Sequence, residues 1–147
     1  MVSLKRRSSG FTIVELLIVI VVIGILAALV IVTYNGIQQK ARDTERKTDV
    51  KALQGQLEAY WANNAKYPTM AQLNDSAFRT ANLKGLDPAA LQDPKGTSQA
   101  VCASSTSSCY GYSVTPSGCD NSTTDCDNYV LTATLEAGGT FSVQSNN

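Results

Sequence analysis

The pattern of hydrophobic and polar residues divides the chain into an apolar N-terminal stretch and a mixed remainder. From Leu16 to Val32 no residue is polar, and counted from Phe11 only Thr12 and Glu15 interrupt the run. As a helix this stretch is about 33 Å long, enough to cross a hydrocarbon core of about 30 Å. An isolated strand in lipid leaves its backbone groups unpaired, whereas a helix satisfies them locally. The pattern therefore predicts a membrane helix with one carboxylate near its start.

A water-soluble helical pattern follows a bend signal at residues 33–36 and extends from Ile37 to about Asn64. Its apolar residues fall on one stripe, which we expect to lie in the core: Val50, Leu53, Leu57, Tyr60 and Trp61. Charged residues at 40–51 are interpreted as a solvated face, with helical pairs such as Arg42 with Glu45, Asp43 with Lys47 and Arg46 with Asp49. The two segments together predict one helix of about 50 residues, roughly 75 Å long.

The rest of the chain predicts loops over residues 65–108 and a sheet over residues 109–147. Short helices are expected within the loops, one opened by a capping box at Thr69 and one by Asp87 with Pro88. Alternating patterns predict strands around residues 110–114, 128–136 and 140–144, the last two joined at Gly138. The fold class is therefore α+β, with a long N-terminal helix packed on a small three-stranded antiparallel sheet.

A short basic leader, with lysine and arginine at residues 5–7, ends in Gly10 directly before the apolar run. The junction reads Gly-Phe-Thr-Ile-Val-Glu-Leu-Leu over residues 10–17 and resembles the processing site of type IV pilins and pseudopilins. The resemblance is strict over residues 5–32 and extends in pattern alone to the C-terminus. It implies that a prepilin peptidase cuts between Gly10 and Phe11, that Phe11 is methylated on its new amine, and that Glu15 guides assembly.

The resemblance also implies an organisation and a function for the chain. Residues 1–10 would be the leader, residues 11–36 the transmembrane and assembly half of the helix, and residues 37–147 the exported pilin domain. The expected function is that of a structural subunit of a type IV pilus or related pseudopilus, serving adhesion, motility, DNA uptake or type II-like secretion. Expected partners are other copies of the pilin, the prepilin peptidase, and an assembly ATPase with its membrane platform. One departure is that many family members carry a proline late in this helix, whereas this chain has none before Pro68.

Three alternatives to this interpretation are a cleaved secretory signal peptide, an uncleaved membrane anchor, and a monomeric membrane-anchored binding domain outside the cell. The apolar run is longer than a usual signal core, and no A-x-A site follows it. Basic residues flank both ends of the run, and a simple count favours an exported N-terminus. Cysteine usage and the family resemblance favour the reverse orientation, a single-pass inner-membrane protein with its domain outside, later part of a surface pilus or pseudopilus.

Charge and composition narrow the classes of function. The chain has 12 basic and 12 acidic residues, and without the leader its net charge is −3. No lysine or arginine follows Lys95, which argues against binding nucleic acid through a basic C-terminal face. The chain contains no histidine, so serine or cysteine nucleophiles would have no imidazole partner. We therefore expect no enzymatic activity.

The four cysteines form two C-x6-C pairs, Cys102 with Cys109 and Cys119 with Cys126. Zinc sites usually have tighter C-x2-4-C spacing, whereas an even count in an exported domain indicates disulfides. Four cysteines allow three connectivities, and we favour the two local pairs because each closes a short loop.

Acidic residues crowd the second cysteine loop, at Asp120, Asp125 and Asp127. Hard oxygen ligands of this kind suit calcium, and some pseudopilins that resemble this chain bind calcium in a comparable loop. The alternative is that these residues only make local hydrogen bonds in turns. No other cofactor is expected.

Overall fold

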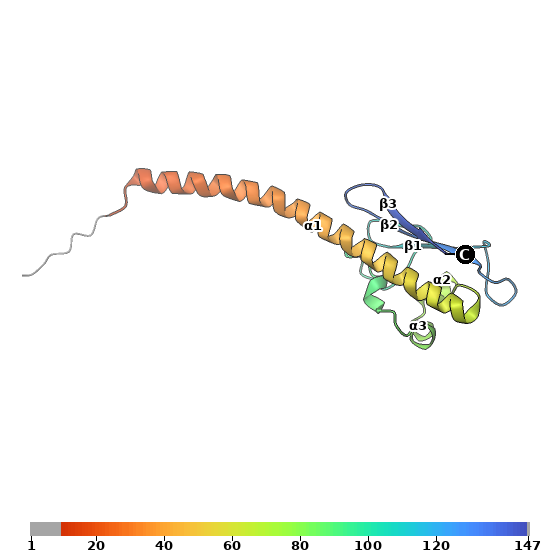
Figure 1. Ribbon diagram of the computed structural model, residues 1–147. Coiled ribbons are helices and arrows are strands. Elements are labelled where there is room, and N and C mark those ends of the chain that lie inside the picture. Colours follow the sequence, from red (N-terminus) through yellow and green to blue (C-terminus); the bar gives the residue numbers. More distant parts are fainter. Residues whose placement is uncertain (1–9, 147) are drawn as a thin grey trace, which may run out of the picture. The chain divides into compact units, whose positions relative to one another are not determined.

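The computed structural model describes residues 10–146 and confirms the α+β class. Its elements are α1 (Ile13–Asn64), α2 (Met70–Asn74), α3 (Ser76–Asn82), the 3-10 helix η1 (Pro88–Leu91), β1 (Gly111–Thr115), β2 (Asn128–Thr134) and β3 (Thr140–Gln144), as labelled in Figure 1. The chain divides into two compact units after Gln38. The basic residues of the predicted leader, at 5–7, lie outside the described residues.

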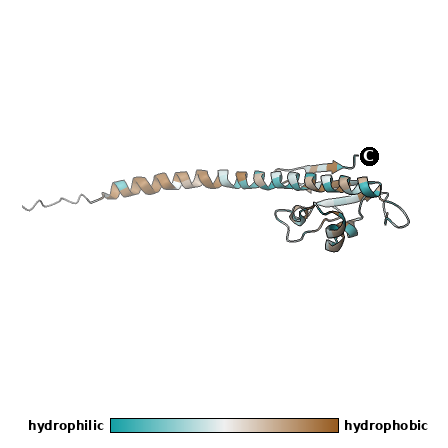
Figure 2. Cartoon of the chain, turned by 60° about the horizontal axis from the view of Figure 1, so that its bottom comes forward, coloured by the Kyte–Doolittle hydropathy of each residue, from teal (hydrophilic) through white to brown (hydrophobic). Residues whose placement is uncertain are grey.

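The first unit contains the start of α1 and presents its apolar side chains to the outside. From Phe11 to Ile37 the large hydrophobic residues are between 47% and 85% exposed. Figure 2 shows this segment as the most hydrophobic part of the helix. Among the described residues, α1 alone is long and apolar enough to cross a membrane. An exposed apolar surface of this extent marks a membrane or protein contact, so the segment is suited to anchor the chain.

The second unit is built on residues 39–64 of α1, whose predicted apolar stripe is confirmed. Val50, Leu53 and Leu57 are fully buried, Tyr60 is nearly so, and Trp61 packs partly buried against the same core. The spacing of three and four residues places these side chains on one face of the helix. The core side chains from the other elements include Leu73, Leu91, Tyr112, Tyr129 and Leu131.

The sheet has the strand order β1-β2-β3, and both pairs are antiparallel. Along β2 the buried residues Tyr129, Leu131 and Ala133 alternate with residues that are exposed or half-buried. Such alternation is expected where one face of a sheet packs on a core. The register places Leu131 opposite Tyr112 of β1 and Val143 of β3, so the central strand carries the apolar face.

The short helices follow local capping signals. Thr69 and Gln72 form the predicted capping box at the start of α2, and Asp87 caps η1, with Pro88 as its first residue. The sequence analysis missed α3, which begins immediately after α2. Asp75 ends α2 and also caps α3, its side chain accepting a hydrogen bond from the N–H of Ala77. A residue with both roles joins two helices without a linker, and periodicity does not reveal so short an element.

A buried arginine connects α1 to two distant segments. Arg46 is completely buried and forms a two-pronged ion pair with Asp93, at 2.7 and 3.0 Å. Its Nη1 also donates to Asp43 at 2.9 Å and to Glu136 at 3.0 Å. These carboxylates raise the pKa of Arg46, and the hydrogen bonds that Arg46 donates to Asp93 contribute most. The expectation of a wholly solvated charged face is therefore wrong, because the partners come from elsewhere in the chain.

Glu136, in the turn after β2, completes this ion cluster. It accepts from Arg42 at 2.6 and 2.8 Å and pairs with Lys95 at 2.8 Å. The hydrogen bonds from Arg42 and Lys95 hold the pKa of Glu136 well below its usual range. Burial raises the pKa of Asp43, but the backbone N–H groups of Glu136 and Ala137 and the Arg46 guanidinium outweigh it, so the net pKa is lowered. The cluster thus connects the β2–β3 turn to α1 through charge-assisted hydrogen bonds.

Tyrosines make a second set of polar contacts between α1 and the rest of the core. Glu58 accepts hydrogen bonds from the hydroxyls of Tyr67 at 3.0 Å and Tyr129 at 2.9 Å, and the two rings meet edge to face. The Tyr110 hydroxyl donates to Asp49 at 2.7 Å. Burial raises the pKa of Asp49, and this hydrogen bond offsets part of the rise. The tyrosine rings add apolar area while their hydroxyls satisfy acidic groups on the helix.

Candidate functional site

The predicted processing site lies at the start of the first unit. Gly10 and Phe11 precede the first helical residue, Ile13, and both are exposed, Phe11 by 85%. Nothing lies within 4 Å of the position that a Gly10 Cβ would occupy. The peptide bond between Gly10 and Phe11 therefore lies in an exposed, non-helical segment directly before a helix.

Glu15 closes the first turn of α1 by a reciprocal capping interaction with Thr12. Its carboxylate accepts from the Thr12 backbone N–H at 2.8 Å and from the Thr12 hydroxyl at 2.7 Å. In return, the Thr12 hydroxyl accepts from the backbone N–H of Glu15 at 3.2 Å. This is a capping box, a role for Thr12 that the sequence analysis did not assign. The pattern of threonine followed three residues later by glutamate was the signal for it.

Both cysteine pairs are disulfides in the second unit. Cys102 is bonded to Cys109 and Cys119 to Cys126, with Cα–Cα distances of 6.1 and 5.3 Å. These are the two local pairs that short loop closure favours. Each bond closes a loop beside β1. It stabilises the folded domain by about 2–3 kcal/mol, because it reduces the number of conformations open to the unfolded chain.

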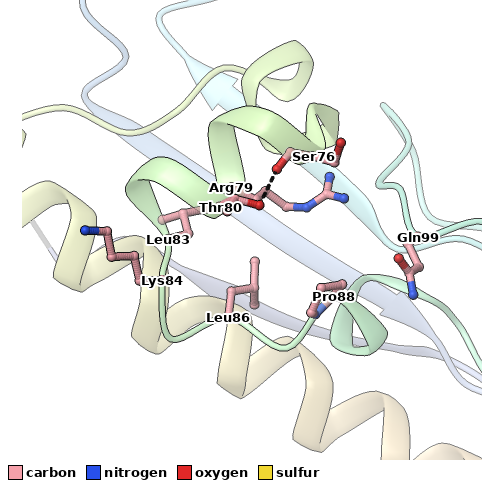
Figure 3. A pocket seen from close by; sticks show the side chains of 8 residues that line it. All are labelled: Ser76, Arg79, Thr80, Leu83, Lys84, Leu86, Pro88 and Gln99. Carbon is pink, nitrogen blue, oxygen red and sulfur yellow. Dashed lines mark hydrogen bonds between the residues drawn. The ribbon is translucent and has the colours of Figure 1, made fainter.

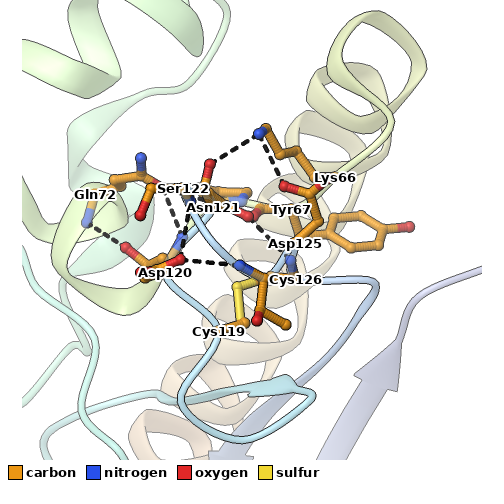
Figure 4. The surroundings of a disulfide bond; sticks show 12 residues. Lys66, Tyr67, Gln72, Cys119, Asp120, Asn121, Ser122, Asp125 and Cys126 are labelled. Atoms are coloured by element: carbon orange, nitrogen blue, oxygen red, sulfur yellow. Dashed lines mark hydrogen bonds and ion pairs between the residues drawn. A yellow bond between two sulfur atoms is a disulfide. The ribbon is translucent and has the colours of Figure 1, made fainter.

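Asn121 connects the second disulfide loop to the segment that follows α1 and to α2, as Figure 4 shows. The Asn121 amide donates to the Tyr67 carbonyl at 2.7 Å and to Gln72 Oε1 at 3.1 Å, and accepts from the Cys126 N–H at 2.9 Å. Its φ of 63° lies in the left-handed region, which asparagine tolerates better than most residues. The position therefore needs both the amide and the backbone freedom of asparagine, a requirement that sequence reasoning missed.

Lys66 supplies a positive charge to the same loop. Its ammonium donates to Asp125 at 2.9 Å and to the Asn121 carbonyl at 3.0 Å (Figure 4). The Asp120 carboxylate instead accepts from the backbone N–H groups of Thr123, Ser122 and Thr124, which hold the pKa of Asp120 well below its usual range.

Asp127 lies at the end of the loop, where its backbone N–H donates to the Thr115 carbonyl. The three predicted calcium ligands thus lie in different surroundings. Within residues 10–146, no group of three or more acidic, histidine or cysteine side chains is placed to hold a metal ion. Calcium binding stays a prediction.

These features define an α+β protein whose apolar N-terminal helix is long enough to cross a membrane, with an exposed glycine before it and a glutamate in a capping box at its start. Comparison with known proteins identifies the class more closely. Residues 5–31 match the prokaryotic N-terminal methylation motif. The motif and the relatives described next support the type IV pilin and pseudopilin family.

The relatives are type II secretion system core proteins. The chain is 44% identical over 68 residues to core protein G of Aeromonas hydrophila, an alignment that covers 46% of this chain and 48% of that protein. It is 41% identical over 69 residues to core protein G of Dickeya chrysanthemi, covering 47% and 45%. It is 36% identical over 80 residues to core protein G of Escherichia coli K12, covering 54% and 55%. The chain thus spans about half the length of these relatives, and no solved structure matches it significantly.

Proposed function

We propose that this chain is a structural subunit of a pseudopilus or type IV pilus, with a pseudopilus of a type II secretion system as the specific case. The observation that carries the proposal is the methylation motif over residues 5–31, which includes the start of an apolar helix whose side chains are exposed. The similarity to core protein G proteins supports the secretion system over adhesion or motility.

In this proposal the subunit is first an inner-membrane protein whose second unit faces outward. A prepilin peptidase cuts between Gly10 and Phe11, and the Phe11 amine is methylated. The apolar helix then leaves the membrane and packs with its copies in the fibre, driven by an ATPase and its membrane platform. The second unit, held together by two disulfides, forms the outer surface.

Glu15 has a specific part in this proposal. A charged side chain at the centre of a membrane helix costs about 2.5–3.5 kcal/mol on insertion scales, although near the helix end it can reach the interface. In the uncut chain Thr12 already supplies two hydrogen bonds to the carboxylate. Cleavage adds an amine at Phe11, which is mostly protonated at neutral pH. That amine, from the same or a neighbouring copy, gives the carboxylate a charged partner inside the fibre.

The test compares processing and assembly in cells that depend on this subunit. We expect the intact mass of the mature chain to begin at Phe11 with one added methyl group, and a bulky residue in place of Gly10 to block the cut. Glu15→Val should be inserted and cut normally yet assemble few or no filaments. Mature protein that still begins at Met1 would contradict the processing step.

The same experiment separates the fibre from the alternative of a monomeric anchored binding domain. Correct processing with no filaments from the wild-type chain would favour that monomer. Normal filament yield from Glu15→Val, as the sole copy in the cell, would remove the assembly role of Glu15. Thr12→Val is the matched variant, because it removes the hydroxyl of the capping box and keeps the charge.

A further inference from the structure

A cavity of about 290 Å³ opens between α3 and η1 in the second unit. Figure 3 shows the apolar lining residues, Leu83, Leu86 and Pro88, with polar side chains beside and around them. Two of the polar groups are cations, Arg79 of α3 and Lys84 of the loop that follows it. The lining therefore combines positive charge with an apolar wall.

Arg79 is the unusual member of this lining because it is a charged side chain that is only 8% exposed. Its Nη1 donates to the Leu73 carbonyl at 2.8 Å, and no carboxylate within residues 10–146 pairs with it. Arg42 and Arg46, by contrast, each pair with at least one carboxylate. A guanidinium has five donors, and a buried charge is normally paired. The cavity thus contains a nearly buried cation whose remaining donors have no anion.

Size and lining indicate which anion would fit. Pockets for drug-sized ligands occupy about 300–1,000 Å³, so this cavity is at the small end. An apolar wall suits a short aliphatic stem, and the planar fork of arginine matches a carboxylate with two parallel hydrogen bonds. Lys84 is exposed and can approach the same group from the rim. The chemistry is that of an acidic side chain entering from another molecule.

One acidic residue of this protein, Glu45, has an exposed carboxylate without a partner in the described part of the chain, which complements the Arg79 guanidinium. Glu45 is exposed on α1, and it makes no hydrogen bond or ion pair within the described part of the chain. Other exposed carboxylates are engaged: Asp75 and Asp87 cap short helices, and Asp125 pairs with Lys66.

We propose that Glu45 of one copy enters the cavity of a neighbouring copy and pairs with Arg79 and Lys84. This contact rests on the proposed function, because only an assembled fibre presents α1 of one copy to the cavity of another at a fixed position. It would join each subunit to its neighbour outside the apolar helices and would help to set their relative positions. The Arg79 charge would then be paired in the fibre.

Cysteine crosslinking in assembled fibres tests the contact directly. Glu45→Cys and Lys84→Cys chains are expressed together, oxidised, and separated on a non-reducing gel. We expect covalent dimers that contain one chain of each kind. Lys47→Cys replaces Glu45→Cys as the matched control, because Lys47 is exposed on α1 only two residues away and should give few dimers. Equal dimer yield from both pairs would refute a specific contact.

Charge reversal gives a second, independent readout that leaves the Arg79 hydrogen bond intact. Glu45→Lys should reduce filament yield about tenfold, which corresponds to about 1.4 kcal/mol per contact. Adding Lys84→Glu should restore much of it. Correct processing and unchanged fluorescence of Trp61 serve as folding controls. Filaments in normal yield from Glu45→Lys, without specific crosslinks, would overturn this contact and leave the proposed function standing. A wild-type chain that forms no fibre would overturn both.

Discussion

Replacing the buried Arg46 by methionine is expected to destabilise the second unit severely. The substitution keeps much of the volume but leaves Asp93, which is 1% exposed, and Asp43, which is 5% exposed, without their guanidinium partner. Removing one member of a buried ion pair costs about 3–5 kcal/mol, because the other charge stays buried and unpaired. That is a large share of the roughly 5–15 kcal/mol that stabilises a typical domain.

Urea unfolding of the detergent-solubilised full chain measures this effect. Trp61 is the sole tryptophan and packs against the core, so its fluorescence reports on the second unit. With an m-value of about 2 kcal/mol per molar urea, the midpoint should fall by about 2 M. Arg42→Met is the matched control and should cost at most about 1 kcal/mol, because Arg42 is 28% exposed and its partner Glu136 retains Arg46 and Lys95.

A double variant tests whether the loss of stability comes from the unpaired buried charge or from the loss of packing contacts. Asp93→Asn in the Arg46→Met background removes one buried charge while its amide oxygen can still accept from the Lys95 N–H. If unpaired charge causes the loss, the second substitution should recover about 1–3 kcal/mol. An Arg46→Met midpoint within about 0.5 M of the wild-type value would refute the argument. Further loss in the double variant would show that packing, not charge, dominates.

Two other predictions follow from the charged groups. Folding lowers the pKa values of Asp43, Asp120 and Glu136, so the stability that these ionised groups contribute is present above about pH 5 and is lost as the pH falls below about 4. The urea midpoint should therefore drop over that range, and it should drop less steeply in Glu136→Gln. Asp49, whose pKa is raised, should offset part of the drop. The predicted calcium site is tested by chelation of calcium-loaded protein. A fall in the melting temperature, reversed by added calcium, would establish the site, whereas no shift would contradict it.

Local pattern was sufficient for much of this fold. The stripe from Val50 to Tyr60, the alternation in β2 and the capping box at Thr69 depend on residues close in sequence, and the structure has all three. The N-terminal methylation motif, matched at residues 5–31, is likewise contiguous in sequence. The local disulfide connectivity agreed with loop length, since each pair is separated by only seven positions.

Tertiary structure alone decided which polar residues meet. Arg46 has an acidic residue at helical spacing on either side, Asp43 and Asp49, and the sequence favoured Asp49. In the structure its two-pronged partner is Asp93, 47 positions away, and Asp49 bonds Tyr110 instead. Asn121 and Arg79 show the same principle, because their surroundings come from segments that only folding brings together. Hydrophobic periodicity records which face of an element is buried, whereas the partner of a buried charge depends on the arrangement of whole elements, which no local pattern encodes.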